Sequence, residues 1–273
     1  MSGTTSASAD LVGAPADEAI PRLLELYGDK LYRLGVQQCG DEEEAHDLVQ
    51  EIFTTAFRKW KQFEGRSEPS SWLYTIAVRI CRRRHRRRAG EPAHHVPLET
   101  LLPAQEVAVP IVPHEDDPLT ATLRREARER VDRAISRLPI HYRMPLLLKE
   151  IAELTIDEVA EILDLKPATV KTRLHRARLL LRKEIETLLP SADLPEPEHS
   201  RRICLDLLRA KQEALDRGVE LPVPDEELCS RCRALFDTLE LAHSACRSIQ
   251  AGEQLPAEVR RMVLDEISAE PLD

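Results

Sequence analysis

The stretch TIDEVAEILDLKPATVKTRLHRARLLLRKEI, residues 155–185, has the pattern of two helices separated by a short break. Apolar residues recur at helical spacing up to Leu163, and Pro167 can begin a second helix. Asp164 lies in the break, where Asp tolerates a left-handed backbone. Val170 and Leu174 give the second helix an inner face. Polar and basic residues lie on or beside its outer face: Lys171, Thr172, Arg173, His175, Arg176 and Arg178.

This arrangement is typical of a helix-turn-helix, whose second helix needs hydrogen-bond donors for phosphates and base edges. It therefore predicts DNA binding. The alternative is an ordinary helical hairpin with a solvated basic face. The whole chain of 273 residues has a net charge of -9, so any attraction for nucleic acid must come from locally concentrated positive charge.

Charge is distributed unevenly along the chain. Residues 191–273 contain 18 acidic and 10 basic residues, a net of -8, so this tail carries nearly all of the excess negative charge. Residues 79–88 contain seven arginines, whereas residues 89–123 contain no Lys or Arg but six acids and six prolines. A basic stripe followed by an acidic, Pro-rich segment indicates two surfaces made for different partners.

The composition favours helices over strands, because Leu, Ala, Arg and Glu dominate while only 9 residues are Gly and 4% are aromatic. We predict an all-α fold: two small helical domains joined by a flexible linker, plus a helical C-terminal domain rich in Cys. The predicted order is a disordered leader at 1–15, a helical domain at 16–88, a linker at 89–122, a second helical domain at 123–190 and a third unit at 199–273. No apolar run is long enough for a membrane span and no signal peptide opens the chain, so we expect a cytoplasmic location.

Two polar features stand out in the first domain. Asp41 can cap a helix, with Glu44 three residues later in the capping-box position. On this helix, Asp47, Gln50 and Glu51 form a polar patch beside an apolar face. Pattern alone favours a solvated helix face for this patch.

Farther on, aromatic residues precede the arginine stripe. This association suits single-stranded nucleic acid, because rings stack on bases and arginines hold phosphates. The alternative places the rings, Trp72 above all, in the core.

The six cysteines fall into two groups. Cys39 and Cys81 lie alone in apolar helical patterns and are expected to be core thiols. In the tail, Cys229 and Cys232 form a Cys-x-x-Cys pair at a predicted helix start, where two thiolates can converge on one ion and the helix dipole lowers their pKa. Cys204 can supply a third thiolate. The fourth ligand is open between two residues: His199 and Asp225.

His243 and Cys246 complete a less favourable set. On an unbroken helix from Cys232, His243 lies roughly 16 Å farther along, too far for one zinc ion. These two residues share a face and leave open a weaker second site. The alternative for the whole tail is a helical segment with incidental thiols.

Three features together resemble, in their order and spacing, the extracytoplasmic-function (ECF) branch of the sigma-70 family. They are the polar patch, the aromatic residues with the arginine stripe, and the helix-turn-helix. Residues 20–88 are similar to sigma region 2, with the Asp-x-x-Gln-Glu-x-Phe segment, and residues 126–186 are similar to region 4. The resemblance implies a promoter-specificity subunit of bacterial RNA polymerase that has no enzymatic activity of its own. Region 2 would bind the clamp of the large subunit and capture a flipped base of the minus-10 element. Region 4 would bind the minus-35 duplex and the polymerase flap.

The resemblance also implies roles for individual residues. The polar patch becomes the candidate polymerase contact, and the loop at 63–71 becomes the minus-10 reading loop, with Phe63 and Arg66 as its contacts. Non-template phosphates would be contacted by Arg79, Arg82 and Arg83. The minus-35 contacts would be Thr169, Lys171, Thr172, Arg173 and Arg176. The linker would thread the polymerase channel.

The tail resembles the zinc-binding anti-sigma domains that clamp sigma factors of this class, with Asp225 at the position where those domains have His. The resemblance implies Zn²⁺ or another thiophilic metal as a possible cofactor. It also implies a regulatory partner, either this tail acting in cis or a separate anti-sigma factor.

Two other protein classes are alternatives for the whole chain. One is a helix-turn-helix regulator that never joins polymerase. The other is an enzyme, for which the sequence offers no phosphate-binding loop, paired carboxylates or nucleophile motif.

Overall fold

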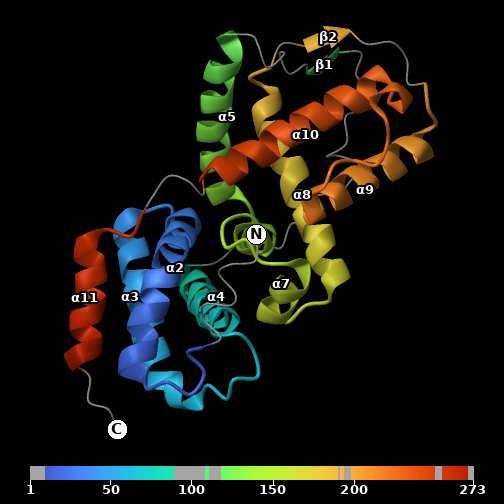
Figure 1. Cartoon of the computed structure of the whole chain (residues 1–273). Helices are drawn as coiled ribbons and strands as arrows, with labels where there is room; N and C mark the ends of the chain where they lie inside the picture. The colour runs from blue at the N-terminus through green and yellow to red at the C-terminus, as the bar shows by residue number, and fades with distance from the viewer. Residues whose placement is uncertain are drawn as a thin grey trace. The chain divides into compact units, whose positions relative to one another are not determined.

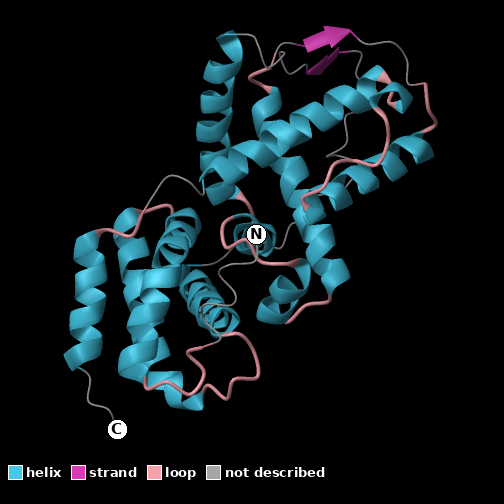
Figure 2. Ribbon diagram, viewed as in Figure 1, coloured by secondary structure: helices cyan, strands magenta, loops and turns pink. Residues whose placement is uncertain are grey.

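The structure, a computed structural model, describes residues 10–88, 108–110, 118–189, 191–193, 198–249 and 254–269. Helices make up nearly all of it (Figure 1), which confirms the all-α class. Figure 2 shows the one addition within the described residues, a pair of short strands. The chain divides into two compact units: Met1–Pro92 with Met144–Pro167 and Gln250–Asp273, and Ala93–Arg143 with Ala168–Ile249.

The first unit is built on α2 (Ala16–Cys39), α3 (Glu42–Lys59) and α4 (Pro69–Arg88). Gly35 allows α2 and α3 to approach closely, since a Cβ at this position would lie 3.3 Å from the Cβ of Ala45. Gly40 ends α2 in the left-handed region with φ 74°. Asp41 then caps α3 by accepting a hydrogen bond from the Glu44 N–H at 2.9 Å, as the sequence predicts.

An aromatic cluster connects α3 to α4. Trp60, which begins the short 3₁₀ helix η1 (Trp60–Gln62), lies with its ring centroid 5.0 Å from that of Phe63 and 5.6 Å from that of Trp72. Its indole N–H donates to the carbonyl of Ala14 at 2.7 Å, and Leu11 is buried. Residues 10–15, expected to belong to a disordered leader, are therefore part of the first unit. The rest of that leader, residues 1–9, lies outside the described residues.

Two later segments join this unit. Helix α7 (Ile156–Leu163) begins with a capping box between Thr155 and Glu158 and ends at Asp164, which adopts the expected left-handed conformation with φ 55°. It packs against α4. Helix α11 (Ala257–Ala269), near the C-terminus, packs against α2 and α3 (Figure 1).

The second unit contains α5 (Pro118–Arg137), α8 (Pro167–Glu186), α9 (Arg201–Arg217), the 3₁₀ helix η3 (Asp225–Glu227) and α10 (Ser230–Ser248). Helix α6 (Ile140–Glu150) begins in this unit and ends in the first. Strands β1 (Ala108–Pro110) and β2 (Ser191–Asp193) pair antiparallel, with Val109 opposite Ala192. Helix α10 packs against α5, α9 and β1.

The domain boundaries differ from the expected ones in two places. The tail is not a third unit, because α9 and α10 belong to the second unit while α11 belongs to the first. Helix α5 begins at Pro118, inside the segment expected to be linker; Pro is well suited to a first helical position because its missing N–H needs no partner there. The other linker residues apart from 108–110 lie outside the described part of the chain. Within the described part, no helix is both long enough and apolar enough to cross a membrane.

Candidate functional site

The polar patch on α3 is only partly available in this structure. Asp47 is exposed, whereas Gln50 and Glu51 are half-buried. The Gln50 amide donates a hydrogen bond to the carboxylate of Glu266 on α11. The structure thus brings a tail residue onto one of the three side chains predicted to contact polymerase.

Glu51 has a different environment, because it joins α3 to the arginines of α4. Arg84 donates to one carboxylate oxygen of Glu51 from Nε at 2.9 Å and from Nη2 at 2.7 Å, and Arg83 pairs with the other oxygen. Arg84 also donates to the carbonyl of Glu44 at 3.3 Å. Charge-assisted contacts of this kind fix the helix pair, so Glu51 has a structural role whatever else it binds.

The predicted nucleic-acid contacts of the first unit are placed as follows. Phe63 is half-buried in the aromatic cluster, and Arg66 is exposed in the following loop, where it pairs with Glu64. Arg79, Arg82 and Arg83 are exposed along α4. Arg82 also donates to the Leu163 carbonyl at the end of α7, at 3.0 Å. The arginine stripe therefore presents guanidinium groups at the surface while part of it ties neighbouring elements together.

The predicted minus-35 contacts lie in the first half of α8. Thr172 is exposed and its hydroxyl donates to the Ala168 carbonyl at 2.9 Å, one turn earlier on the same helix. Arg176 donates to the hydroxyl of Tyr142 at 3.3 Å. The others are half-buried: Thr169, Lys171 and Arg173. This half of α8 thus keeps several donors within reach of the surface.

The second half of α8 contains a buried ion-pair network that the sequence analysis missed. Arg178, expected on the outer face, is only 1% exposed and donates to Asp216 of α9 at 2.6 Å. The other carboxylate oxygen of Asp216 lies 3.1 Å from the His175 ring, and Gln212 donates to the His175 carbonyl at 3.4 Å. The expectation for Arg178 was wrong because α9 covers this side of α8.

Asp216 is held in its charged form by these partners. Burial by itself raises the pKa of this carboxyl, but the His175 hydrogen bond and the Arg178 charge outweigh it, so the pKa lies below its ordinary value of 3.8. One turn beyond Arg178, Arg182 is 2% exposed and pairs with Glu186. Burial lowers the pKa of Arg182, and the charge of Glu186 opposes that effect.

The sequence did contain a signal for this network. Val170, Leu174, Arg178 and Arg182 follow one another at intervals of four residues and so lie along one side of the helix. The first two are buried and were predicted to be so. The same spacing places the two arginines on the buried side, which a closer use of the helical period would have shown.

Three of the tail cysteines lie in or against an apolar core of the second unit. Cys229 and Cys232 are buried, and Cys204 packs against the core that they share with Leu179 of α8. Burial raises the pKa of the Cys232 thiol, and the adjacent thiols of Cys229 and Cys204 raise it further. This is opposite to the lowering expected from the helix dipole, because desolvation dominates at this position.

The remaining predicted metal ligands do not complete a set. The His199 ring lies 3.1 Å from the carbonyl of Glu227, while the Cys204 thiol lies 3.9 Å from the His199 carbonyl. The Asp225 side chain is outside the described residues. Across the described segments, no group of three or more His, Cys, Asp or Glu side chains could hold a metal ion as arranged. Three neighbouring thiols nevertheless have the donor chemistry that a soft cation prefers.

Comparison with known proteins gives two family matches. The family model for Sigma-70 region 2 matches residues 23–91, and that for Sigma-70, region 4 matches residues 128–181. Neither match extends into the Cys-rich tail.

Two individual relatives agree with these matches. The chain is 32% identical over 177 residues to the ECF RNA polymerase sigma factor SigW of Bacillus subtilis, and the aligned region covers 63% of this chain and 91% of the relative. It is 30% identical over 147 residues to the ECF RNA polymerase sigma-E factor of Escherichia coli, covering 52% of this chain and 74% of the relative. A solved structure of CnrH in complex with the cytosolic domain of CnrY aligns with a TM-score of 0.47 at 20% identity, over 66% of this chain and 98% of that one.

The Arg178–Asp216 pair leads to a stability prediction. Replacing Asp216→Asn removes the charge and leaves a buried guanidinium uncompensated, so we expect the free energy of unfolding at neutral pH to fall by about 3 kcal/mol. Chemical denaturation of the full chain measures it. Glu213→Gln is the matched control, since Glu213 is an exposed carboxylate on the same helix.

The pH dependence has a definite sign. Because the pKa of Asp216 is lowered in the folded chain, its contribution to stability is present above the unfolded pKa and disappears as pH falls through the folded one. The difference between wild type and Asp216→Asn should therefore shrink in acid. Equal stability of the two proteins at neutral pH would show that the pair does not hold α9 on α8.

Proposed function

The chain belongs to the ECF branch of the sigma-70 family of RNA polymerase sigma factors, and we propose that it directs core RNA polymerase to a particular class of promoters. The observation that carries this proposal is the similarity to SigW, which spans 91% of that relative. We assign the chain no catalytic activity and place its work in the cytoplasm, where promoter DNA is transcribed.

In this proposal the first unit binds polymerase and the minus-10 element. The exposed carboxylate of Asp47, with Gln50 beside it one turn along α3, supplies the polymerase contact. Guanidinium groups of α4 reach non-template phosphates, which neutralises charge without reading sequence. The exposed loop around Arg66, next to Phe63 in the aromatic cluster, can receive a base that has left the stack.

The first half of α8 would read the minus-35 duplex. Hydroxyl, ammonium and guanidinium donors of Thr172, Lys171 and Arg173 suit base edges and phosphates in a major groove. Their position before the point where α9 covers the helix supports this role, because Arg178 and Arg182 are already used inside the protein.

The alternative function is a helix-turn-helix regulator that binds DNA without polymerase. The two proposals separate in an assay of the full chain with core polymerase and a promoter duplex. A sigma factor should co-purify with core polymerase and start run-off transcripts at a defined position. A protein that binds the duplex but neither joins core polymerase nor starts transcripts would support the alternative.

Substitutions should divide the two binding activities. We expect Lys171→Ala and Arg173→Ala each to weaken promoter binding and to leave core binding unchanged. If the lost contact is to a phosphate, the slope of the logarithm of the promoter binding constant against the logarithm of salt concentration should fall in magnitude by about 1. We expect Asp47→Ala to weaken core binding and leave duplex binding intact. Lys183→Ala, an exposed position farther along α8, is the control. Promoter affinity that does not respond to either α8 substitution would remove this helix from DNA recognition.

We further propose that the Cys-rich tail regulates the sigma factor in cis through a metal ion or the thiol state. The support is chemical and spatial: three thiols adjoin one another, and two of them share an apolar core with Leu179 of α8. A soft cation would take Cys204, Cys229 and Cys232 as ligands, displacing their protons. A remaining ligand would come from His199 or Asp225, after the His199 ring leaves the Glu227 carbonyl.

Metal analysis of protein purified without chelator tests the tail proposal. We expect about one zinc or other thiophilic ion per chain, lost in Cys229→Ser and retained in Cys39→Ser, a half-buried thiol of the first unit. Absence of metal together with a transcription response to oxidant would indicate the thiol switch. Transcription that responds neither to metal nor to oxidant would contradict regulation through these cysteines.

A further inference from the structure

We propose that α11 and core polymerase compete for the same face of α3, so that the chain must release its own C-terminal helix to join polymerase. This inference rests on the proposed function, because it takes α3 as the polymerase-binding helix. It assigns to residues 254–269 a binding partner within the same chain, namely the side of α3 that carries Gln50 and the middle of α2 around Gly28 and Asp29.

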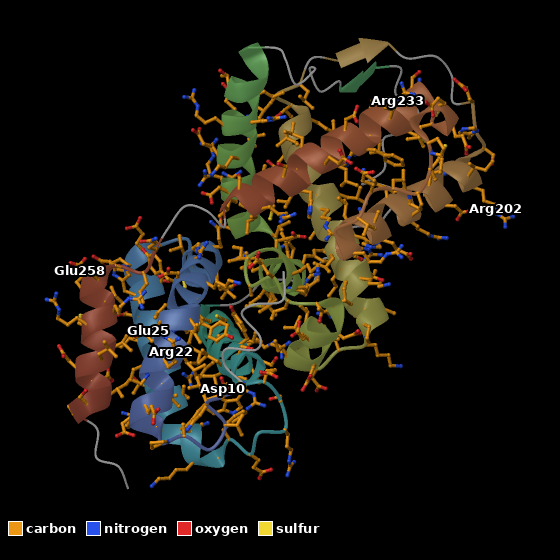
Figure 3. The ribbon with its side chains drawn as sticks, in the orientation of Figure 1. Asp10, Arg22, Glu25, Arg202, Arg233 and Glu258 are labelled. Carbon is orange, nitrogen blue, oxygen red and sulfur yellow. The ribbon has the colours of Figure 1, made fainter. Side chains whose placement is uncertain are left out.

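An apolar stripe fixes the orientation of α11. Val259, Val263 and Ile267 recur every four residues and are 2%, 0% and 4% exposed. The opposite side of the helix is exposed, with Met262 at 48%. Figure 3 shows Glu258 at the start of this helix, in its first turn. The helix is thus amphipathic, and its apolar side has a defined place against α3 and α2.

The segment that leads into α11 is anchored on α2. Leu255 is buried, and a Cβ at Gly28 would lie 3.1 Å from its Cδ2 atom, so the absence of a side chain at Gly28 makes room for the leucine. Asp29 accepts hydrogen bonds from the Leu255 N–H and from Arg260, both at 3.1 Å. Arg260 also donates to the Leu24 carbonyl at 3.3 Å. Apolar, charged and backbone contacts therefore converge at one end of the helix.

The other end of α11 meets the polymerase patch. The carboxylate of Glu266 accepts the hydrogen bond from Gln50, and both side chains are half-buried. Gln50 marks the side of α3 on which α11 lies. Thr54 and Phe57, one and two turns farther along that side, are each only 6% exposed. A partner that needs Gln50 and the surface around it cannot bind while α11 is in place.

The contact is suited to competition because α11 can leave. It is a single helix of 13 residues, a length that is marginal for an isolated helix, so its order depends on the surface beneath it. Since it is tethered to the same chain, it rebinds at a high effective concentration. Polymerase affinity is then reduced in proportion to the fraction of chains in which α3 is free.

The test measures core polymerase affinity and amide hydrogen exchange of α11 in the full chain. Val263→Asp places a charge in the buried stripe, and Arg260→Glu turns the attraction to Asp29 into repulsion. We expect both to remove exchange protection from α11, leave protection of α2 and α4 intact and raise the affinity for core polymerase about tenfold or more. Met262→Asp, on the exposed side of α11, should change neither quantity.

The outcomes distinguish this inference from the proposed function. If α11 loses protection in either variant and core affinity stays at the wild-type value, the competition is wrong although the protein is a sigma factor. If α11 remains protected in the complex of wild type with polymerase, the competition is equally wrong. If wild type and variants all fail to bind core polymerase, the proposed function fails and takes this inference with it.

Discussion

The burial of Arg178 determines what the tail of this protein has to supply. A guanidinium keeps its proton at any ordinary pH, so a fold that removes it from water must place an acid beside it. Asp216 of α9 meets this need at 2.6 Å, with His175 on its other oxygen at 3.1 Å. Neither α8 nor α9 could bury its half of this pair alone. Helix α9 is therefore built into the second unit and is not an appendage to a finished DNA-binding helix.

The same logic explains why the tail's net charge of -8 is a poor description of how it acts. At physiological salt, exposed charges are screened beyond about 8 Å, so diffuse negative charge cannot shield a basic face from a distance. Individual acids make the contacts instead. Asp216 holds Arg178 on α8, and Glu266 accepts from Gln50 on α3. Each contact involves a helix to which we assign a binding function, one in each unit.

Sequence reasoning predicted the local features well. The cap at Asp41, the left-handed Asp164 and the helical class all depend on residues within a few positions of one another. Which surface each tail helix would cover was not predicted, because amphipathic spacing gives the direction of an apolar face but does not identify its partner. The expectation of a third domain failed for this reason. Arg178 was misplaced by giving more weight to its charge than to its position in the stripe of Val170 and Leu174.

Because the thiols pack against α8, a chemical change at their sulfur atoms can alter the packing of the tail on this helix. Cys229 and Cys232 pack in one core with Leu179, and protein cores are close-packed, so a change in volume or charge at the sulfur atoms must be accommodated by their neighbours. A charged ion or an oxidised sulfur at that point would disturb the packing of α9 and α10 beside the Arg178–Asp216 pair. Helix α11 is held separately, by its own apolar stripe and by Asp29 of α2. The two attachments of the tail can therefore respond to different signals: thiol chemistry in the second unit, and competition for a shared surface in the first.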